Sequence, residues 1–144
     1  MKPEHDPRAR EHHAELERFL TKLGVAVTTG DGKAAARLWE VPAFFLGDGM
    51  ARPIATYEEI AEFFGNARAT YNAKGIQETR PEILQEEWIA DGLVQVKVRW
   101  PYLDATMHEV GAETSEYTLA RDAGGKLKLR VAVAHGVEGV RERA

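Results

Sequence analysis

Between Gly92 and Gly136 the sequence contains three runs in which apolar and polar residues alternate: Leu93-Val-Gln-Val-Lys-Val-Arg-Trp-Pro-Tyr-Leu-Asp104, Gly111-Ala-Glu-Thr-Ser-Glu-Tyr-Thr-Leu-Ala-Arg-Asp122 and Lys126-Leu-Lys-Leu-Arg-Val-Ala-Val-Ala-His135. A period of two is typical of a strand that buries one face. The segment Asp122-Ala-Gly-Gly-Lys126 predicts a turn, and residues 104–111 predict a longer loop. The three runs therefore predict an antiparallel meander with one apolar face.

The register of this meander follows from the centres of its two turns. A second turn centred near Gly124 gives four inward-facing pairs: Leu119 with Leu129, Tyr117 with Val131, Ser115 with Val133, and Glu113 with His135. A first loop centred between Thr106 and Met107 places Trp100 beside Glu113 on the apolar face. On the outer face, Lys97 then lies across from Glu116. The register thus predicts an ionisable pair, Glu113 and His135, at the end of an apolar surface.

Three helices are predicted before the meander. The first begins near Glu11 and buries a stripe at helical spacing, namely Leu16, Phe19, Leu20, Leu23 and Val27. A second, short helix covers Lys33–Trp39 and ends before Pro42. After short strands over residues 43–46 and 50–54, the capping box Thr56-x-x-Glu59 opens a third helix that ends at Lys74-Gly75. Its apolar stripe contains Ile60, Phe63, Phe64, Ala67 and Tyr71.

Residues 76–90 predict an irregular strand that Pro81 interrupts and that Asp91-Gly92 joins to the meander. Its register has two alternatives. A two-residue loop turns Ile83 and Ile89 inward, whereas a three-residue loop turns Leu84, Glu86 and Trp88 inward.

Composition limits the classes of protein that fit. At 144 residues the chain is long enough for one domain with a core. We expect that domain over residues 11–136, between a flexible tail at 1–10 and a C-terminal tail at 137–144. A net charge of −4 with scattered Lys and Arg gives no reason to expect nucleic acid or an anionic membrane as a partner. The absence of cysteine excludes disulfides and thiol nucleophiles, and without an apolar leader or spanning segment we expect a cytoplasmic protein.

The order of these elements resembles the NTF2-like superfamily, in particular its SnoaL-like or ketosteroid-isomerase-like cone. The resemblance covers residues 15–136. It is carried by Thr29-Gly-Asp-Gly-Lys-Ala-Ala-Ala-Arg-Leu-Trp-Glu40, Phe44-Phe-Leu-Gly-Asp-Gly49, Tyr57-Glu-Glu-Ile-Ala-Glu-Phe-Phe64 and the last hairpin from Tyr117 to Leu129. It implies an α+β fold, with three N-terminal helices packed on a strongly curved antiparallel sheet (a cystatin-like cone) and a central pocket.

The same resemblance implies several kinds of function, because this fold hosts isomerases, dehydratases, cyclases, epoxide hydrolases and binding modules. In the isomerase branch a general-base carboxylate stands near the end of the first short strand. Here that position is Leu46-Gly47, and Asp48 follows in the turn. The acid–arginine–acid set of the epoxide hydrolases and the paired histidines of the dehydratases also lack counterparts in this sequence.

Four residues are the candidates for catalysis. Glu113 and His135 could transfer a proton between them and a substrate, although a cross-strand ion pair would look the same in the sequence. Pro101 inside a strand predicts a bulge that turns Tyr102 and Asp104 toward the mouth of the pocket, with ordinary loop residues as the alternative.

Five residues are the candidates for ligand binding, because aromatic and flexible apolar side chains suit a flat apolar ligand; they are Trp39, Phe44, Met50, Trp100 and Tyr117. Each could equally be a core residue. No metal site is predicted, because His108 and Glu109 belong to no short ligand motif. No phosphate loop or other cofactor motif is present either.

Two functions therefore remain open from the sequence. The first is a cofactor-free proton-transfer enzyme, of isomerase, dehydratase or cyclase type, that acts on a small apolar carbonyl or hydroxyl compound. The second is a non-catalytic ligand-binding or dimerisation module. For either, we expect a small apolar or aromatic ligand and a homodimer through the outer sheet face, whose small and polar residues are Gln95, Lys97, Thr114, Glu116, Thr118, Ala132 and Ala134.

Overall fold

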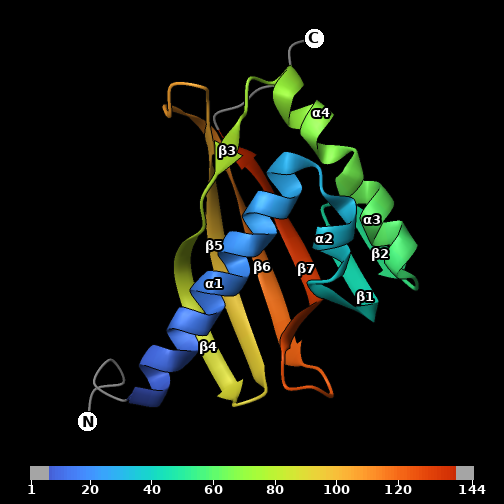
Figure 1. The fold of residues 1–144 in the computed structure, drawn as a ribbon, viewed down its shortest axis with the longest axis vertical. Coiled ribbons are helices and arrows are strands. Elements are labelled where there is room, and N and C mark those ends of the chain that lie inside the picture. Colours follow the sequence, from blue (N-terminus) through green and yellow to red (C-terminus); the bar gives the residue numbers. More distant parts are fainter. Residues whose placement is uncertain (1–6, 139–144) are drawn as a thin grey trace.

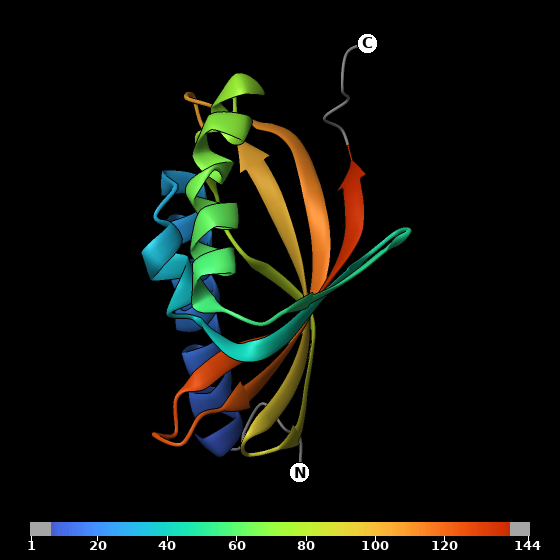
Figure 2. The same cartoon turned by 90° about the vertical axis from the view of Figure 1, so that its right-hand side faces the viewer.

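The computed structural model describes residues 7–138, apart from the side chains of residues 68, 137 and 138. Its helices are α1 (Pro7–Thr29), α2 (Gly32–Ala36), α3 (Tyr57–Gly65) and α4 (Ala67–Ala73). Its strands are β1 (Trp39–Gly47), β2 (Met50–Ile54), β3 (Glu78–Thr79), β4 (Glu82–Ala90), β5 (Leu93–Leu103), β6 (Glu109–Arg121) and β7 (Leu127–Glu138). The strands form one sheet, and the helices cover one of its faces (Figures 1 and 2).

Helix α1 lies across the concave face of the sheet and is held there by its predicted apolar stripe. Leu16 and Leu20 are fully buried, and Leu23 is 4% exposed. The helix begins at Pro7 rather than at Glu11, so residues 7–10 are helical where a flexible tail was expected; proline is well tolerated in a first helical turn. Of the C-terminal tail expected at 137–144, residues 137 and 138 belong to β7, and residues 1–6 and 139–144 of the two expected tails lie outside the described residues.

The second and third predicted helices differ from the structure in extent. Helix α2 ends at Ala36, because Trp39 already pairs with Leu129 as the first residue of β1. The third predicted helix is two helices, α3 and α4, which meet at Asn66. The cap predicted at Thr56 is confirmed, since its hydroxyl accepts a hydrogen bond from the Glu59 N–H at 3.3 Å.

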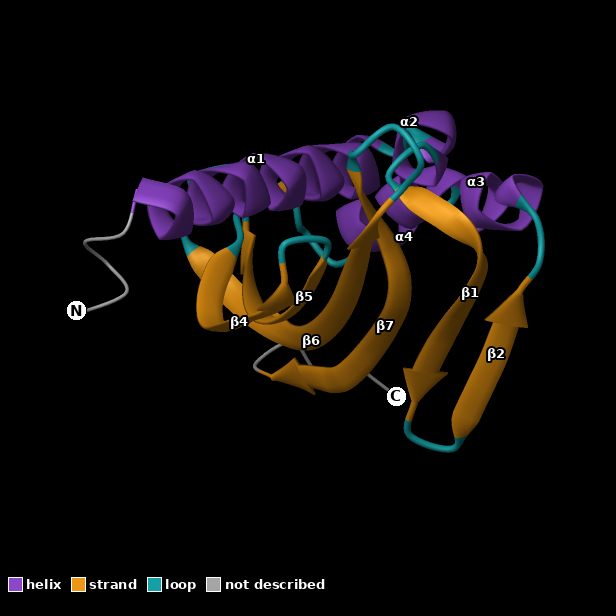
Figure 3. Cartoon of the chain, turned by 90° about the horizontal axis from the view of Figure 1, so that it is seen from below, coloured by secondary structure: helices purple, strands orange, loops and turns teal. Residues whose placement is uncertain are grey.

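The sheet has the strand order β2-β1-β7-β6-β5, and β3 and β4 both pair with β5. Within residues 7–138, every pairing is antiparallel except that of β1 with β7. Seen from below, the central strands bend strongly away from the helices, and β1 and β2 form a hairpin at the edge of the sheet beside β7 (Figure 3). The α+β cone with an open, curved sheet is thus confirmed.

The register of the central hairpin is confirmed. Trp100 pairs with Glu113 and Lys97 with Glu116. The bulge predicted at Pro101 is displaced, because pairing stays regular through Tyr102 and is irregular only before Leu103. Simple alternation therefore directs Tyr102 inward, where it is 5% exposed.

The register of the last hairpin is correct only at its start. Leu119 pairs with Leu129 as predicted, but Tyr117 then pairs with Ala132 and Ser115 with Ala134, because β7 contains an extra residue, Arg130. A second irregularity at His135-Gly136, where Gly136 has φ +104°, places Val137 opposite Glu113.

These bulges change which residues of β7 face outward. One extra residue moves every following side chain to the opposite face. The predictions that Ala132 and Ala134 lie on the outer face are therefore wrong. Ala132 is 3% exposed, and both alanines line the cavity under the helices.

Strand β4 combines the two registers that the sequence left open. Glu86 and Trp88 pair with the inward-facing Val96 and Val94, as the three-residue loop predicts. Ile83 also faces inward, opposite Val98, because Leu84 is an extra residue that is 51% exposed.

None of the helices within residues 7–138 is both long and apolar enough to cross a membrane.

Candidate active site

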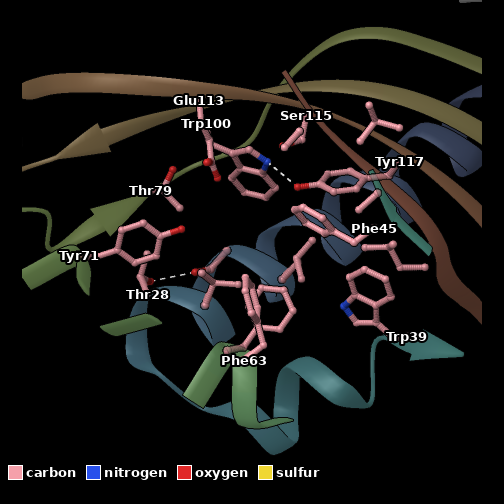
Figure 4. A pocket seen from close by; sticks show the side chains of 18 of the residues that line it. Thr28, Trp39, Phe45, Phe63, Tyr71, Thr79, Trp100, Glu113, Ser115 and Tyr117 are labelled. Atoms are coloured by element: carbon pink, nitrogen blue, oxygen red, sulfur yellow. Dashed lines mark hydrogen bonds between the residues drawn. The ribbon is translucent and has the colours of Figure 1, made fainter. Parts of the chain in front are cut away.

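A cavity of about 150 Å³ lies between the helices and the concave face of the sheet. Its walls come from α1, α3 and α4 on one side and from β1, β3, β5, β6 and β7 on the other. Most lining groups are apolar, and the polar ones gather around Glu113 (Figure 4). Phe63 lines the cavity and is still 54% exposed, so it stands at the entrance.

Glu113 is the acidic group of this cavity, and hydroxyl groups surround it. Tyr102 from β5 and Tyr71 from α4 lie on its side of the cavity, with their rings 5.8 Å apart. Thr79 and Ser115 also line this part of the cavity. Across the described residues, no Lys, Arg or His side chain forms an ion pair with Glu113.

Burial raises the pKa of the Glu113 carboxyl above its ordinary value of 4.5, because a charged carboxylate loses solvation in the cavity. Interaction with the Tyr102 hydroxyl, followed by the charge of Lys74, acts in the opposite direction and lowers that pKa in part. Burial, followed by the nearby Glu113 charge, also raises the pKa of the Tyr71 and Tyr102 hydroxyls. Both tyrosines are therefore protonated hydrogen-bond donors at neutral pH.

The central part of the cavity wall is held by a hydrogen bond between Trp100 and Tyr117. The Trp100 indole N–H donates to the Tyr117 hydroxyl at 2.9 Å (Figure 4). Gly24 of α1 lies directly against this indole: a Cβ atom at Gly24 would stand 2.9 Å from Trp100 Cζ3. Glycine at this position therefore lets α1 approach the sheet closely enough to close the cavity on that side.

The other end of the cavity is aromatic. Trp39 and Phe45 from β1 face Phe63 and Phe64 from α3. The same four residues also line a smaller neighbouring cavity of about 50 Å³, so they form the partition between the two spaces. Trp39 is 2% exposed, and its indole N–H has no hydrogen-bond partner among the described residues.

The predicted pair of Glu113 and His135 does not form. His135 lies on the outer face, where its Nε2 atom is 2.5 Å from Glu116 Oε2, while Glu113 faces the cavity. The physical reason is the extra residue in β7, which turns His135 away from the cavity. The predicted pairing is wrong, and a catalytic role for His135 in this cavity has no geometric support.

The other predicted site residues divide into two groups. The predicted catalytic residue Tyr102 lines the cavity, and so do the predicted ligand-binding residues Trp39, Trp100 and Tyr117. Asp104 does not, because its carboxylate accepts hydrogen bonds from the backbone and side chain of Thr106 and from the His108 N–H, and so organises the β5–β6 loop. Phe44 is 48% exposed on β1, and Met50 is 46% exposed and lines only the smaller cavity.

Sequence reasoning missed three polar cavity residues that the structure adds, namely Thr28, Tyr71 and Thr79. A signal existed for Tyr71, because it ends the apolar stripe of the third predicted helix and carries the only hydroxyl in that stripe. Within residues 7–138, no three His, Asp or Glu side chains come together in a way that could hold a metal ion.

Comparisons with solved structures show the same fold in other proteins. A domain with a cystatin-like fold from Nostoc punctiforme is 16% identical, with a TM-score of 0.67 over 91% of this chain and 78% of that chain. The protein Aln2 from a Streptomyces species is 19% identical, with a TM-score of 0.67 over 90% and 91% of the two chains. A ketosteroid isomerase-like protein from Erwinia carotovora atroseptica is 16% identical, with a TM-score of 0.63 over 87% of this chain and 95% of that chain. At these identities the likeness concerns the fold alone.

A comparison with curated proteins gave no match. A family model described as "NTF2-like protein (DUF6841)" matches residues 10–137, which include all of the cavity-lining residues. The cone, the cavity under its helices and this match lead to one conclusion. The chain belongs to the NTF2-like protein family DUF6841.

Proposed function

We propose that the protein binds a small, largely apolar carbonyl compound in the 150 Å³ cavity and that Glu113 transfers a proton on it. One observation carries this proposal: an ionisable carboxyl group faces an apolar cavity, next to protonated tyrosine hydroxyls and without an ion pair to any described residue. Such a group is poorly suited to a stabilising role, because a buried charge without a counter-ion destabilises the folded state. Ionisable groups with perturbed pKa values in clefts are enriched at functional sites.

The chemistry follows from the residue types around the cavity. The Glu113 carboxylate accepts a proton from a carbon atom next to the substrate carbonyl, and the electron pair of that C–H bond moves to the carbonyl oxygen. The Tyr71 or Tyr102 hydroxyl donates a hydrogen bond to the enolate oxygen that forms, which stabilises its negative charge. Return of the proton from Glu113 to a different atom of the enolate completes an isomerisation. A raised pKa improves Glu113 as a base near neutral pH.

The alternative is a binding module without catalysis, and one contact favours it. The Tyr102 hydroxyl already interacts with Glu113 and would have to be shared with a substrate. In that case the carboxyl group recognises a hydroxyl or N–H group of a ligand and transfers no proton.

Exchange of substrate protons with solvent separates these functions. We expect the protein to catalyse exchange of the α-protons of single-ring ketones in D₂O, followed by NMR, with a rate that rises with pH through the raised pKa of Glu113. Glu113→Gln removes the base but keeps the side-chain size, so exchange should fall by about 100-fold or more, the usual contribution of a general base. Glu116→Gln is the matched control, because Glu116 lies on the opposite face of the same strand. Binding without exchange in the unmodified protein would favour the binding module, and exchange that persists in Glu113→Gln would contradict the proposed role of Glu113.

We also propose a homodimer through the outer face of β5, β6 and β7. Support comes from the polar groups there, including Gln95, Lys97, Glu116 and Thr118, which line a groove with Val133. Sedimentation at micromolar concentration tests the proposal, and a monomer under those conditions would contradict it.

A further inference from the structure

The unpartnered indole of Trp39 points to the class of ligand that the cavity takes. We propose that this ligand is an uncharged, single-ring compound with oxygen functions at two ends, one held near Glu113 and the other accepting a hydrogen bond from the Trp39 indole N–H. This inference rests on the ligand-binding part of the proposed function and adds the substrate class to it.

The first step concerns the hydrogen bonding of the three tryptophans. The indole N–H of Trp100 donates to Tyr117 at 2.9 Å, and that of Trp88 donates to Glu86 at 2.8 Å. Among the side chains that the structure describes, the Trp39 N–H is the one polar group that is both buried and without a partner. Buried polar groups nearly always have a partner, and one that has none in the protein itself is a site where a ligand or an ordered water gains a hydrogen bond.

The second step concerns the position of Trp39. It lines the main cavity, and with Phe45, Phe63 and Phe64 it separates that cavity from the smaller one. Figure 4 shows its indole nitrogen on the side of the ring that faces the other lining side chains, across the pocket from Glu113 and Tyr71. A ligand that fills the cavity therefore meets hydroxyl donors and a carboxyl at one end and an N–H donor at the other.

The third step concerns charge. Among the described residues, Arg, Lys and His are all absent from the cavity lining, and its acidic residue is Glu113. A ligand carboxylate or phosphate would enter an apolar space without a counter-ion and be repelled by Glu113. The ligand atom that accepts the hydrogen bond from the Trp39 N–H is consequently a neutral oxygen, such as that of a ketone or an aldehyde.

The fourth step concerns size. A dry apolar cavity of about 150 Å³ is large enough for benzene. The cavity of this protein has the same volume, about 150 Å³, and its neighbour adds about 50 Å³ behind an aromatic partition. One ring with two small substituents matches the size of the two spaces together, whereas a fused four-ring compound is too large.

Two isosteric probes test the assignment. 1,4-Diacetylbenzene carries a carbonyl at each end, and 4-isopropenylacetophenone replaces one carbonyl oxygen with a CH₂ group. Titration calorimetry should show about tenfold tighter binding of 1,4-diacetylbenzene, the equivalent of about 1.4 kcal/mol. Trp39→Phe keeps an aromatic ring but removes the N–H, so this preference should fall below about twofold. The anion 4-acetylbenzoate should not bind.

A second measurement on the unmodified protein covers the case in which Trp39→Phe does not fold. The Trp39 indole proton should move downfield in the NMR spectrum on addition of 1,4-diacetylbenzene and should not do so with 4-isopropenylacetophenone. The Trp88 indole proton, bonded to Glu86, is the internal control. Equal affinity for the two probes, no binding of either, tight binding of 4-acetylbenzoate, or a preference that survives in Trp39→Phe would each overturn the assignment.

The result also separates this inference from the proposed proton transfer. In Glu113→Gln we expect proton exchange to be lost while the preference for 1,4-diacetylbenzene remains. A preference without exchange in the unmodified protein would refute the proton transfer alone. Exchange that depends on Glu113, without a preference between the probes, would refute the role of Trp39 alone.

Discussion

Gly32 is the residue at which the packing of the helices can be tested most directly. It is the first residue of α2 and lies against the backbone of α3, where a Cβ atom would stand 1.9 Å from the Ala61 carbonyl oxygen. Ordinary contacts between such atoms are near ~3.5 Å, so Gly32→Ala requires the two helices to separate by roughly 1.5 Å. The obstructing atom belongs to the backbone and has no rotamer by which to move aside.

The size of the effect follows from this geometry. Extra methyl groups in well-packed sites destabilise by about 1–3 kcal/mol, and a clash with backbone belongs at the upper end of that range. For a chain of this length, a loss of about 3 kcal/mol lowers the melting temperature by about 10 °C. Helix α3 also carries Phe63 and Phe64 of the cavity wall, so the affinity for a single-ring ketone should fall as well.

Gly65→Ala is the matched control, because no atom lies within 4 Å of its added Cβ and Gly65 ends the same helix, α3. It should leave stability unchanged or raise it by about 0.5–1 kcal/mol, since alanine favours the helix. The stability of both variants is measured by urea and thermal unfolding, monitored by circular dichroism. If Gly32→Ala melts within about 2 °C of the unmodified protein, the close approach of α2 and α3 is refuted.

Three further predictions concern the buried polar groups. Burial raises the pKa of Glu113, so its contribution to stability is present below pH 4.5 and is lost as the pH rises through the folded-state pKa. The urea midpoint of Glu113→Gln minus that of the unmodified protein should therefore increase between about pH 4 and pH 8, and a constant difference would contradict this. Tyr117→Phe leaves the Trp100 N–H buried without its acceptor and should cost about 1–3 kcal/mol in urea unfolding, whereas a loss below about 0.5 kcal/mol would show that the bond is unimportant. The Glu86 carboxylate, which accepts a hydrogen bond from the His13 ring, raises the pKa of His13 above 6.5. His13→Gln should therefore destabilise the protein at about pH 5.5 and have little effect at about pH 9; thermal unfolding at both pH values tests this, and a larger loss at pH 9 would contradict it.

The fold and one side of the cavity were predictable because they depend on alternation. The pairing of Trp100 with Glu113 followed from counting residues around one loop, and the inward direction of Tyr117 followed from the same period. Local patterns of this kind are set by each strand separately and do not require knowledge of the helices.

The last hairpin was not predictable in the same way. Leu127, Leu129, Val131 and Val133 continue one apolar alternation, so nothing in their spacing marks Arg130 as an extra residue. The choice of face depends on what the helices leave room for, and under them the structure places the small Ala132 and Ala134. The role of Tyr71 was obscure for a related reason, because its distance from Glu113 is set by the break between α3 and α4.

The two bulges of β7 make the reactive groups of the cavity depend on strand pairing. If Arg130 paired with Thr118 in place of Val131, the first bulge would disappear, and we expect the residues that follow to exchange faces. With regular pairing continued to the end of the strand, His135 would then leave Glu116 and come to lie across from Glu113, inside the cavity. A slip of one residue would thus give the cavity an acid–base dyad without any change in the sequence. In this fold, the register of one strand can alter the set of reactive groups as directly as point mutations do.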